Sequence, residues 1–375
     1  MKIVLDPQIY NMQRYGGISR YYTEVFEIIL RERKHKIITP LNNSINVYFE
    51  NSELNSFQQK LFKFLIKLLK KAKLDKRLKV YNIGKSRLKK ILAQQDYNLF
   101  VPTYYDTNFL NYIENKPFVL TVYDMIHELF PQYFSDSESL TKNKRLLIEK
   151  ANRIIAVSEN TKKDILKLYP HINEAKIDVI YHGTSIKIKE DTRIDLPEKY
   201  ILFVGTRQIY KNFVFFIQSI SKLLIEEEDL YLVCAGGGSF NRLENELISE
   251  LGLTDKVVFK AFEDNELGFF YKNAKCFVFP SIYEGFGIPV LESMACGCPV
   301  ILANHSSFPE VAGEAGIYFE LNNPTDLESK IANIINDETL RNDFSQKGIE
   351  QAKKFTWENA ALKCIKVYEK ACNSY

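Results

Sequence analysis

The sequence predicts an α/β protein with two Rossmann-like domains that face each other across a cleft. The chain of 375 residues is too long for one ordinary domain and long enough for two. Its 46% hydrophobic content supplies packed cores and excludes a disordered or fibrous protein. Short β-branched or aromatic runs alternate with helical patterns along most of the chain, which is typical of parallel sheets covered by helices on both faces.

The first half of the chain is predicted to form an N-terminal domain over residues 1–183. Apolar runs that end in turns indicate its strands, and helical patterns lie between most of them. The next stretch, residues 184–198, is polar, has no apolar period and contains Pro197, so we expect it to be the interdomain linker. The strands of the first half are expected at residues 2–7, 36–40, 99–103, 118–122, 153–158 and 177–181.

The second half repeats the pattern and predicts a C-terminal domain over residues 199–355, followed by a helix at 356–375. Ligands of such sheets bind beyond the carboxyl ends of the strands, where glycine-containing turns fall in both halves. The binding site is therefore expected at these ends, in the cleft. The strands of the second half are expected at residues 200–205, 230–236, 256–261, 276–280, 299–303 and 316–319.

The segment over residues 277–292 carries the most chemical information. A buried strand ends here, a glycine-rich turn follows, and Pro289 suits the first turn of a helix. Backbone amides at the start of a helix attract an anion such as a phosphate. Carboxylates on either side of a phosphate, here Glu284 and Glu292, accept hydrogen bonds from hydroxyls. The pattern predicts a ligand with central phosphates and hydroxyl-rich ends, which describes a nucleotide-sugar. The amides expected to face the anion are those of Gly285, Phe286 and Gly287.

Each glutamate alone has an ordinary structural explanation. Glu284 is then a turn residue, and Glu292 charges the start of a helix. The strand, the glycine turn, the helix start and both carboxylates occur together in one segment, and this combination favours a binding site.

The same segment resembles a known family. Glu284, seven residues and Glu292 match the E-x7-E signature of the glycogen-synthase-like retaining glycosyltransferases of family 4, which have the GT-B fold. The resemblance covers nearly the whole chain, including the end, where the family's last helix crosses back to the N-terminal domain. Further matches are YGGISRY at 15–21, IAVSEN at 155–160, VGT at 204–206, KN at 211–212, ESMACGCPV at 292–300 and PEVAG at 309–313.

The resemblance implies roles for the residues of the C-terminal domain. Glu284 would contact hydroxyls of the transferred sugar, and Glu292 would contact the ribose. Lys211 would bind the diphosphate, as a point charge beside a helix start can. Many relatives carry an arginine directly after the glycine of this strand, where this chain has Thr206. Arg207 is one residue later, and the sequence leaves open whether it supplies the second positive charge.

In the N-terminal domain, the resemblance implies that Gly16 and Gly17 form a loop that closes over the donor phosphates; an ordinary tight turn is the alternative. Relatives often have histidine where this chain has Tyr123, so the sequence leaves open whether His127 substitutes. Asp124 and His127 are candidates for orienting the acceptor hydroxyl. For Asp124, a cap of a local turn is an equally good explanation.

The resemblance also implies a reaction that retains the anomeric configuration. No carboxylate nucleophile stands out on the acceptor side, so a front-face displacement is expected, with Lys211 and the helix amides stabilising the departing diphosphate. We find no metal-ligand pattern and predict transfer without a metal or other cofactor. The six cysteines form no CxxC pair.

A second unusual feature is the segment over residues 57–92, in which leucine and phenylalanine alternate with lysine. Thirteen Lys or Arg and one Asp lie between Lys60 and Lys90, a local charge of +12 in a chain whose net charge is +3. A basic amphipathic helix of this kind is typical of binding to an anionic membrane surface. A solvated helix packed on the domain is the alternative, and no nucleic-acid-binding module surrounds the segment.

The remaining features suggest a cytoplasmic protein that is peripheral on the inner face of the cell membrane. The first apolar run, residues 1–5, is too short for a signal peptide, and no run reaches the ~20 residues of a membrane span. Residues 122–128 and 204–206 resemble bacterial mannosyltransferases of O-polysaccharide or capsule assembly. We therefore expect transfer of a hexose or deoxyhexose, with GDP-mannose as the first donor candidate, to a lipid-linked or envelope glycan. A nucleotide-sugar epimerase and a catalytically silent binding subunit are the alternatives.

Overall fold

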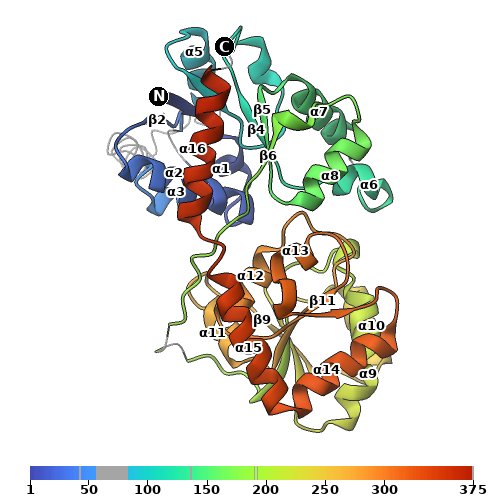
Figure 1. Ribbon diagram of the computed structural model, residues 1–375. Helices are drawn as coiled ribbons and strands as arrows, with labels where there is room; N and C mark the ends of the chain where they lie inside the picture. Colours follow the sequence, from blue (N-terminus) through green and yellow to red (C-terminus); the bar gives the residue numbers. More distant parts are fainter. Residues whose placement is uncertain (42–43, 56–82, 136, 190, 192, 374–375) are drawn as a thin grey trace, which may run out of the picture. The chain divides into compact units, whose positions relative to one another are not determined.

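The computed structural model describes residues 1–41, 44–55, 83–135, 137–189, 191 and 193–373. The chain divides into two compact units. Unit 1 comprises Met1–His182 and Trp357–Tyr375, and unit 2 comprises Gly183–Thr356 (Figure 1). In its described part, the predicted linker over residues 184–198 contains no helix or strand and belongs to unit 2.

Unit 1 is built on parallel strands. The first sheet has the order β2-β1-β3 and the second has the order β4-β5-β6. A parallel bridge between Phe100 and Phe118 joins β3 to the start of β4, so the two sheets continue each other. The strands are β1 Lys2–Leu5, β2 Lys36–Ile38, β3 Leu99–Val101, β4 Val119–Val122, β5 Arg153–Ala156 and β6 Ile177–Val179.

The helices of unit 1 follow the strands, as crossover connections between parallel strands require. The last helix of the chain, α16, packs on α2 within this unit, so the C-terminal segment completes the core of unit 1 (Figure 1). Both helices bury aromatic side chains, among them Tyr21 and Tyr368. The helices are α1 Gln8–Met12, α2 Gly17–Arg31, α3 Val47–Asn51, α5 Ile83–Ala93, α6 Ile126–Leu129, α7 Ser137–Lys150, α8 Glu159–Leu168 and α16 Trp357–Asn373, with short 3₁₀ turns η3 Asn108–Asn111, η4 Pro131–Tyr133 and η5 Glu174–Lys176.

Unit 2 contains one parallel sheet with the order β12-β11-β10-β7-β8-β9. The strand order reverses between β7 and β10, which pair with each other. In sheets of this kind the reversal opens a crevice at the carboxyl ends of the two strands, where ligands bind. The strands are β7 Lys199–Val204, β8 Leu230–Ala235, β9 Val257–Lys260, β10 Cys276–Phe279, β11 Val300–Ala303 and β12 Gly316–Phe319.

The helices of unit 2 cover both faces of this sheet (Figure 1). They are α9 Phe213–Glu226, α10 Arg242–Glu250, α11 Leu267–Asn273, α12 Ile288–Ala295, α13 Phe308–Ala312, α14 Pro324–Asn336 and α15 Glu338–Ala352, with 3₁₀ turns η6 Ile209–Lys211 and η7 Gly313–Ala315.

Each strand predicted from the sequence is present, and most end one or two residues earlier than predicted. None of the helices formed by the described residues is long and apolar enough to cross a membrane. Residues 57–82 of the predicted basic segment lie outside the described residues, and residues 83–92 belong to α5.

Candidate active site

The predicted donor residues Lys211 and Glu284 lie at the reversal point of the unit 2 sheet. Lys211 ends η6, which follows β7, and Glu284 follows β10. The backbone N–H of Ile282 donates to the carbonyl oxygen of Tyr210 at 2.8 Å and ties the two loops together. The fold therefore brings two residues, 73 positions apart in sequence, to the crevice predicted for this sheet type.

Lys211 and Glu284 form an ion pair at this reversal point. The Nζ atom of Lys211 lies 2.5 Å from Oε1 of Glu284, and the two side chains are only 15% and 16% exposed. The ammonium also lies 4.7 Å from the ring centroid of Phe279 and 5.1 Å from that of Tyr210. Because aromatic faces attract cations, the rings hold the lysine even when the carboxylate is engaged elsewhere. An ammonium has three donors, so Lys211 can bind both Glu284 and a phosphate oxygen.

Two serines hold the backbone of the Glu284 loop. The N–H of Glu284 donates to Oγ of Ser306 at 3.2 Å. The buried hydroxyl of Ser307 lies 2.9 Å from the carbonyl oxygen of Glu284 and 3.0 Å from that of Phe286, so these two acceptors share its one proton. Neither serine was predicted from the sequence, since both follow β11 and contact the loop only through the fold. Their position directly before Phe308 and Pro309, at a helix start, was the one available signal.

The glycine turn leads into α12 as predicted. Gly287 has φ +97°, a conformation that side chains rarely adopt, and a Cβ at this position would lie 3.3 Å from the Phe308 ring. Pro289 occupies the first turn of α12. Gly285 and Phe286 are buried in the turn.

The second glutamate of the signature, Glu292, lies on the second turn of α12. The residue is only 5% exposed. A carboxylate buried to this extent needs hydrogen-bond partners. The contact of Glu292 with a ribose stays a prediction.

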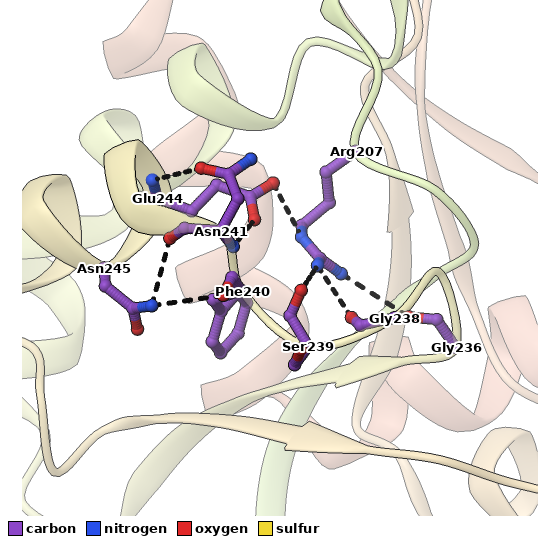
Figure 2. A network of polar contacts seen from close by, with 8 residues as sticks. All are labelled: Arg207, Gly236, Gly238, Ser239, Phe240, Asn241, Glu244 and Asn245. Atoms are coloured by element: carbon purple, nitrogen blue, oxygen red, sulfur yellow. Dashed lines mark hydrogen bonds and ion pairs between the residues drawn. The ribbon is translucent and has the colours of Figure 1, made fainter.

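The guanidinium of Arg207 binds Glu244 and backbone carbonyl oxygens of the turn after β8 (Figure 2). Its Nε atom donates to Glu244 at 2.9 Å, and its NH2 group donates to the carbonyl oxygens of Gly238 at 2.8 Å and Ser239 at 3.0 Å. A longer bond of 3.4 Å reaches the carbonyl oxygen of Gly236, and the side chain is 3% exposed. In this arrangement Arg207 holds the turn after β8, and a phosphate contact by this residue stays a prediction.

The glycines of the N-terminal loop stand at the start of α2. Gly17 is the first residue of the helix, and Gly16 precedes it with an extended φ of 167°. The hydroxyl of Ser19 donates to the carbonyl oxygen of Gly16 at 3.0 Å, and the Ser19 N–H faces Oε1 of Gln13 at 3.4 Å. The loop therefore ends at a helix N-terminus, where the helix dipole favours an anion. Its closure over donor phosphates stays a prediction.

The predicted acceptor residues Asp124 and His127 lie close together in the chain after β4, Asp124 in the loop and His127 in α6. Oδ1 of Asp124 accepts the N–H of Ile126 at 3.2 Å, so the local cap that the sequence allowed is present. The Asp124 side chain is still 34% exposed. The ring of His127 lies on that of Phe134 with centroids 4.2 Å apart. Burial lowers the pKa of His127, which favours a neutral imidazole.

Tyr123, the position at which this chain departs from the family pattern, is buried in an aromatic cluster. Its ring centroid lies 6.2 Å from that of Tyr21 and 6.4 Å from that of Tyr22. Its hydroxyl contacts the carbonyl oxygen of Thr103 at 3.5 Å. The tyrosine therefore serves the core of unit 1, and the partly accessible polar groups of this loop are those of Asp124 and His127.

One further charged residue was missed in this loop's surroundings. Lys144 of α7 is completely buried, and its Nζ donates to Oε2 of Glu128 at 2.9 Å and to the carbonyl oxygen of Asp124 at 3.1 Å. A signal was present in the sequence, because Lys144 shares the buried stripe of its helix with Leu147 and Ile148. A lysine on an apolar stripe needs a partner inside the fold.

Comparisons with known proteins find glycosyltransferases. A family model described as Glycosyltransferase Family 4 matches residues 58–187, and one described as Glycosyl transferases group 1 matches residues 184–351. The chain is 27% identical over 293 residues to O-antigen chain mannosyltransferase B of Escherichia coli, covering 74% of this chain and 76% of that relative.

Solved structures show the same fold. Sucrose-phosphate synthase of Thermosynechococcus elongatus aligns with a TM-score of 0.73 at 19% identity, covering 100% of both chains. HepE of Anabaena, solved in complex with UDP and glucose, aligns with a TM-score of 0.70 at 15% identity, covering 98% of this chain and 99% of that one. The two family models together span residues 58–351. The chain is therefore a glycosyltransferase with the GT-B fold, and it matches the Glycosyltransferase Family 4 model in its first half and the Glycosyl transferases group 1 model in its second half.

Proposed function

We propose that the protein is a retaining hexosyltransferase that moves mannose from GDP-mannose to a lipid-linked or envelope polysaccharide acceptor. The observation that carries the proposal is the Lys211–Glu284 pair at the reversal point of the unit 2 sheet. A cation for a diphosphate and a carboxylate for sugar hydroxyls lie side by side there, as a nucleotide-sugar requires.

The choice of mannose is supported by the relative named O-antigen chain mannosyltransferase B. HepE was solved in complex with UDP and glucose, so a UDP-sugar is the first competing donor. Glu292 would contact the ribose, and the amides of Gly285, Phe286 and Gly287 would face the diphosphate.

In the proposed reaction an acceptor hydroxyl attacks the anomeric carbon from the face that the diphosphate leaves. The new C–O bond forms as the bond between the anomeric carbon and the phosphate oxygen breaks. The hydroxyl proton passes to the departing diphosphate, and the nucleoside diphosphate is released. Lys211 and the amides of the glycine turn stabilise the charge on this leaving group. Asp124 and His127 orient the acceptor hydroxyl. The anomeric proton signal of the product would test this, because an inverted configuration rules out the proposed displacement.

Transfer by this route uses the cation of Lys211 in place of a metal ion. We therefore propose that no metal or other cofactor takes part. The wild-type protein should keep its full transfer rate in excess EDTA, and a loss restored by a divalent cation would contradict the proposal.

We further propose that residues 57–92 bind an anionic membrane surface on the cytoplasmic side, which would bring the enzyme to a lipid-linked acceptor. Each basic residue near such a surface contributes about 1 kcal/mol. The wild-type protein should float with vesicles that contain anionic phospholipid and remain behind with neutral vesicles. Equal behaviour with both would contradict surface binding.

The donor is tested by thermal melting with GDP, UDP, dTDP and ADP and with their common sugar conjugates. A ligand at one hundred times its Kd adds about 2.7 kcal/mol to the apparent stability, which shifts the midpoint measurably. We expect a shift with GDP and GDP-mannose that is absent in Lys211→Ala and Glu292→Ala. A shift with another nucleotide alone would replace the donor, and no shift with any of them would favour a catalytically silent binding subunit.

A further inference from the structure

The polar contacts that the described residues make with the buried lysine of α7 all come from the loop after β4 and the short helix α6 that follows it. They are the Asp124 carbonyl oxygen at 3.1 Å, Oε2 of Glu128 at 2.9 Å and Oδ1 of Asp124 at 3.7 Å. The ammonium also lies 5.2 Å from the ring centroid of Tyr105. The side chain of Lys144 is 0% exposed. A charge buried this deeply is retained in a fold only with good partners.

Two carboxylates share this one cation, and they differ in their access to solvent. Glu128 is 7% exposed, whereas Asp124 is 34% exposed. Burial raises the pKa of Glu128 despite the lysine beside it. Among the described residues, Oε1 of Glu128 has no hydrogen-bond partner. If Lys144 served only to neutralise Glu128, its ion pair with that residue would suffice. The lysine also binds the backbone of Asp124 and approaches its carboxylate.

We propose that Lys144 is a positioning residue for glycosyl transfer, which fixes the loop after β4 and the helix α6 so that Asp124 and His127 meet the acceptor hydroxyl. The ammonium holds Asp124 at its backbone carbonyl oxygen, and the Ile126 N–H donates to Oδ1 of its carboxylate. The partly exposed carboxylate is left with one oriented oxygen for a ligand. This inference rests on the proposed function, because it assigns Lys144 to the acceptor side of that reaction.

Displacement of a reacting group by about 1 Å costs roughly 100-fold in rate, so loss of the anchor should reduce transfer strongly. Donor binding should not change, since Lys144 belongs to unit 1 and the proposed donor residues Lys211 and Glu284 belong to unit 2. The expected signature is therefore a loss in kcat, with acceptor KM altered and the Kd for the nucleotide unchanged.

The variants are chosen to separate positioning from simple charge neutralisation. Lys144→Met alone leaves Glu128 buried without its cation, which destabilises the fold. The double variant Lys144→Met/Glu128→Gln removes both charges and should fold. Glu128→Gln alone keeps the contacts of Lys144 with Asp124. Lys142→Met, on the exposed face of the same helix with its side chain 73% exposed, is the matched control.

We expect Glu128→Gln and Lys142→Met to transfer at nearly the wild-type rate, and the double variant to lose about tenfold to 100-fold in kcat while binding nucleotide normally. If the double variant transfers like wild type, Lys144 only neutralises Glu128 and the proposal is overturned. If Glu128→Gln unfolds or loses transfer as the double variant does, Glu128 is the essential partner and the proposal is again overturned.

A second readout keeps the test independent of transfer activity. The charged groups that act on the His127 ring are Asp124 from its own loop and Lys144 from α7. Burial is the main cause of the lowered pKa of His127, and the ammonium of Lys144 lowers it further. Removal of the ammonium should therefore raise that pKa in the NMR titration of the double variant, with His127→Gln used for assignment. An unchanged titration overturns the placement of Lys144. If the pKa of His127 rises in the double variant but the wild-type protein shows no transfer, the proposed function is contradicted and the placement of Lys144 is not.

Discussion

A double-mutant cycle on Lys211 and Glu284 tests the electrostatic core of the site. In Lys211→Met the Glu284 carboxylate, 16% exposed, loses its cation at 2.5 Å. Breaking a buried ion pair costs about 3–5 kcal/mol and breaking an exposed one about 0–1 kcal/mol, so this partly buried pair should cost about 2 kcal/mol. In Glu284→Gln the ammonium keeps the rings of Phe279 and Tyr210 at 4.7 and 5.1 Å, so the expected cost is about 1 kcal/mol.

The structure thus predicts an asymmetric cycle. The double variant Lys211→Met/Glu284→Gln leaves neither charge unpaired and should lie within about 1 kcal/mol of wild type, which gives a coupling energy of about 2 kcal/mol. The free energies of unfolding are measured in urea by circular dichroism. The matched control is the pair Lys222 and Glu226 on α9, 3.6 Å apart with side chains 74% and 62% exposed, for which about 0.3 kcal/mol is expected. A coupling below about 0.5 kcal/mol, or a larger cost for Glu284→Gln than for Lys211→Met, would refute the reasoning.

Three further predictions concern the surroundings of the site and the core of unit 1. Ser307→Ala removes the hydroxyl shared by the carbonyl oxygens of Glu284 and Phe286, and we expect a loss of about 1–2 kcal/mol and weaker nucleotide binding in calorimetry; unchanged binding would show that the loop holds itself. Gly287→Ala forces a side chain to φ +97° and should cost about 1–3 kcal/mol in urea unfolding, whereas a neutral result would contradict the strained turn. Burial lowers the pKa of His182 to about 3, so the unfolded state binds a proton below its pKa of 6.5 that the folded state excludes. The free energy of unfolding should therefore decrease as the pH is lowered from 6.5 towards 3, by about 2 kcal/mol at pH 5. His182→Gln should remove this pH dependence.

The fold was predictable because it depends on local patterns. Buried parallel strands appear as short apolar runs, and the glycine turns mark their carboxyl ends. The strand ends were placed slightly too far along, for example at residue 205 in place of Val204. Apolar and glycine residues continue past the last ladder hydrogen bond, so composition alone does not show where a strand stops pairing.

The positions of Lys211 and Glu284 were predictable, because each is a charged residue in a turn that follows a strand. Their direct ion pair was not predicted, because it joins loops after two strands whose pairing the sequence does not specify. Ser307 and Lys144 were missed for the same reason, since each acts on a loop distant in sequence. The Arg207 guanidinium donates to backbone carbonyl oxygens of the turn after β8. These contacts could not be predicted, because every residue type has a backbone carbonyl group.

The donor site is tested most directly by transfer of radiolabelled mannose from GDP-mannose to a polyprenyl-diphosphate-linked glycan by wild type and Glu284→Gln. Glu284→Gln keeps the size of the side chain and removes the negative charge that we propose accepts hydrogen bonds from sugar hydroxyls. We predict labelled glycan with wild type and a loss of about 100-fold in kcat with Glu284→Gln, at unchanged GDP affinity. Equal transfer by both proteins would contradict the proposal that the Lys211–Glu284 pair belongs to the donor site.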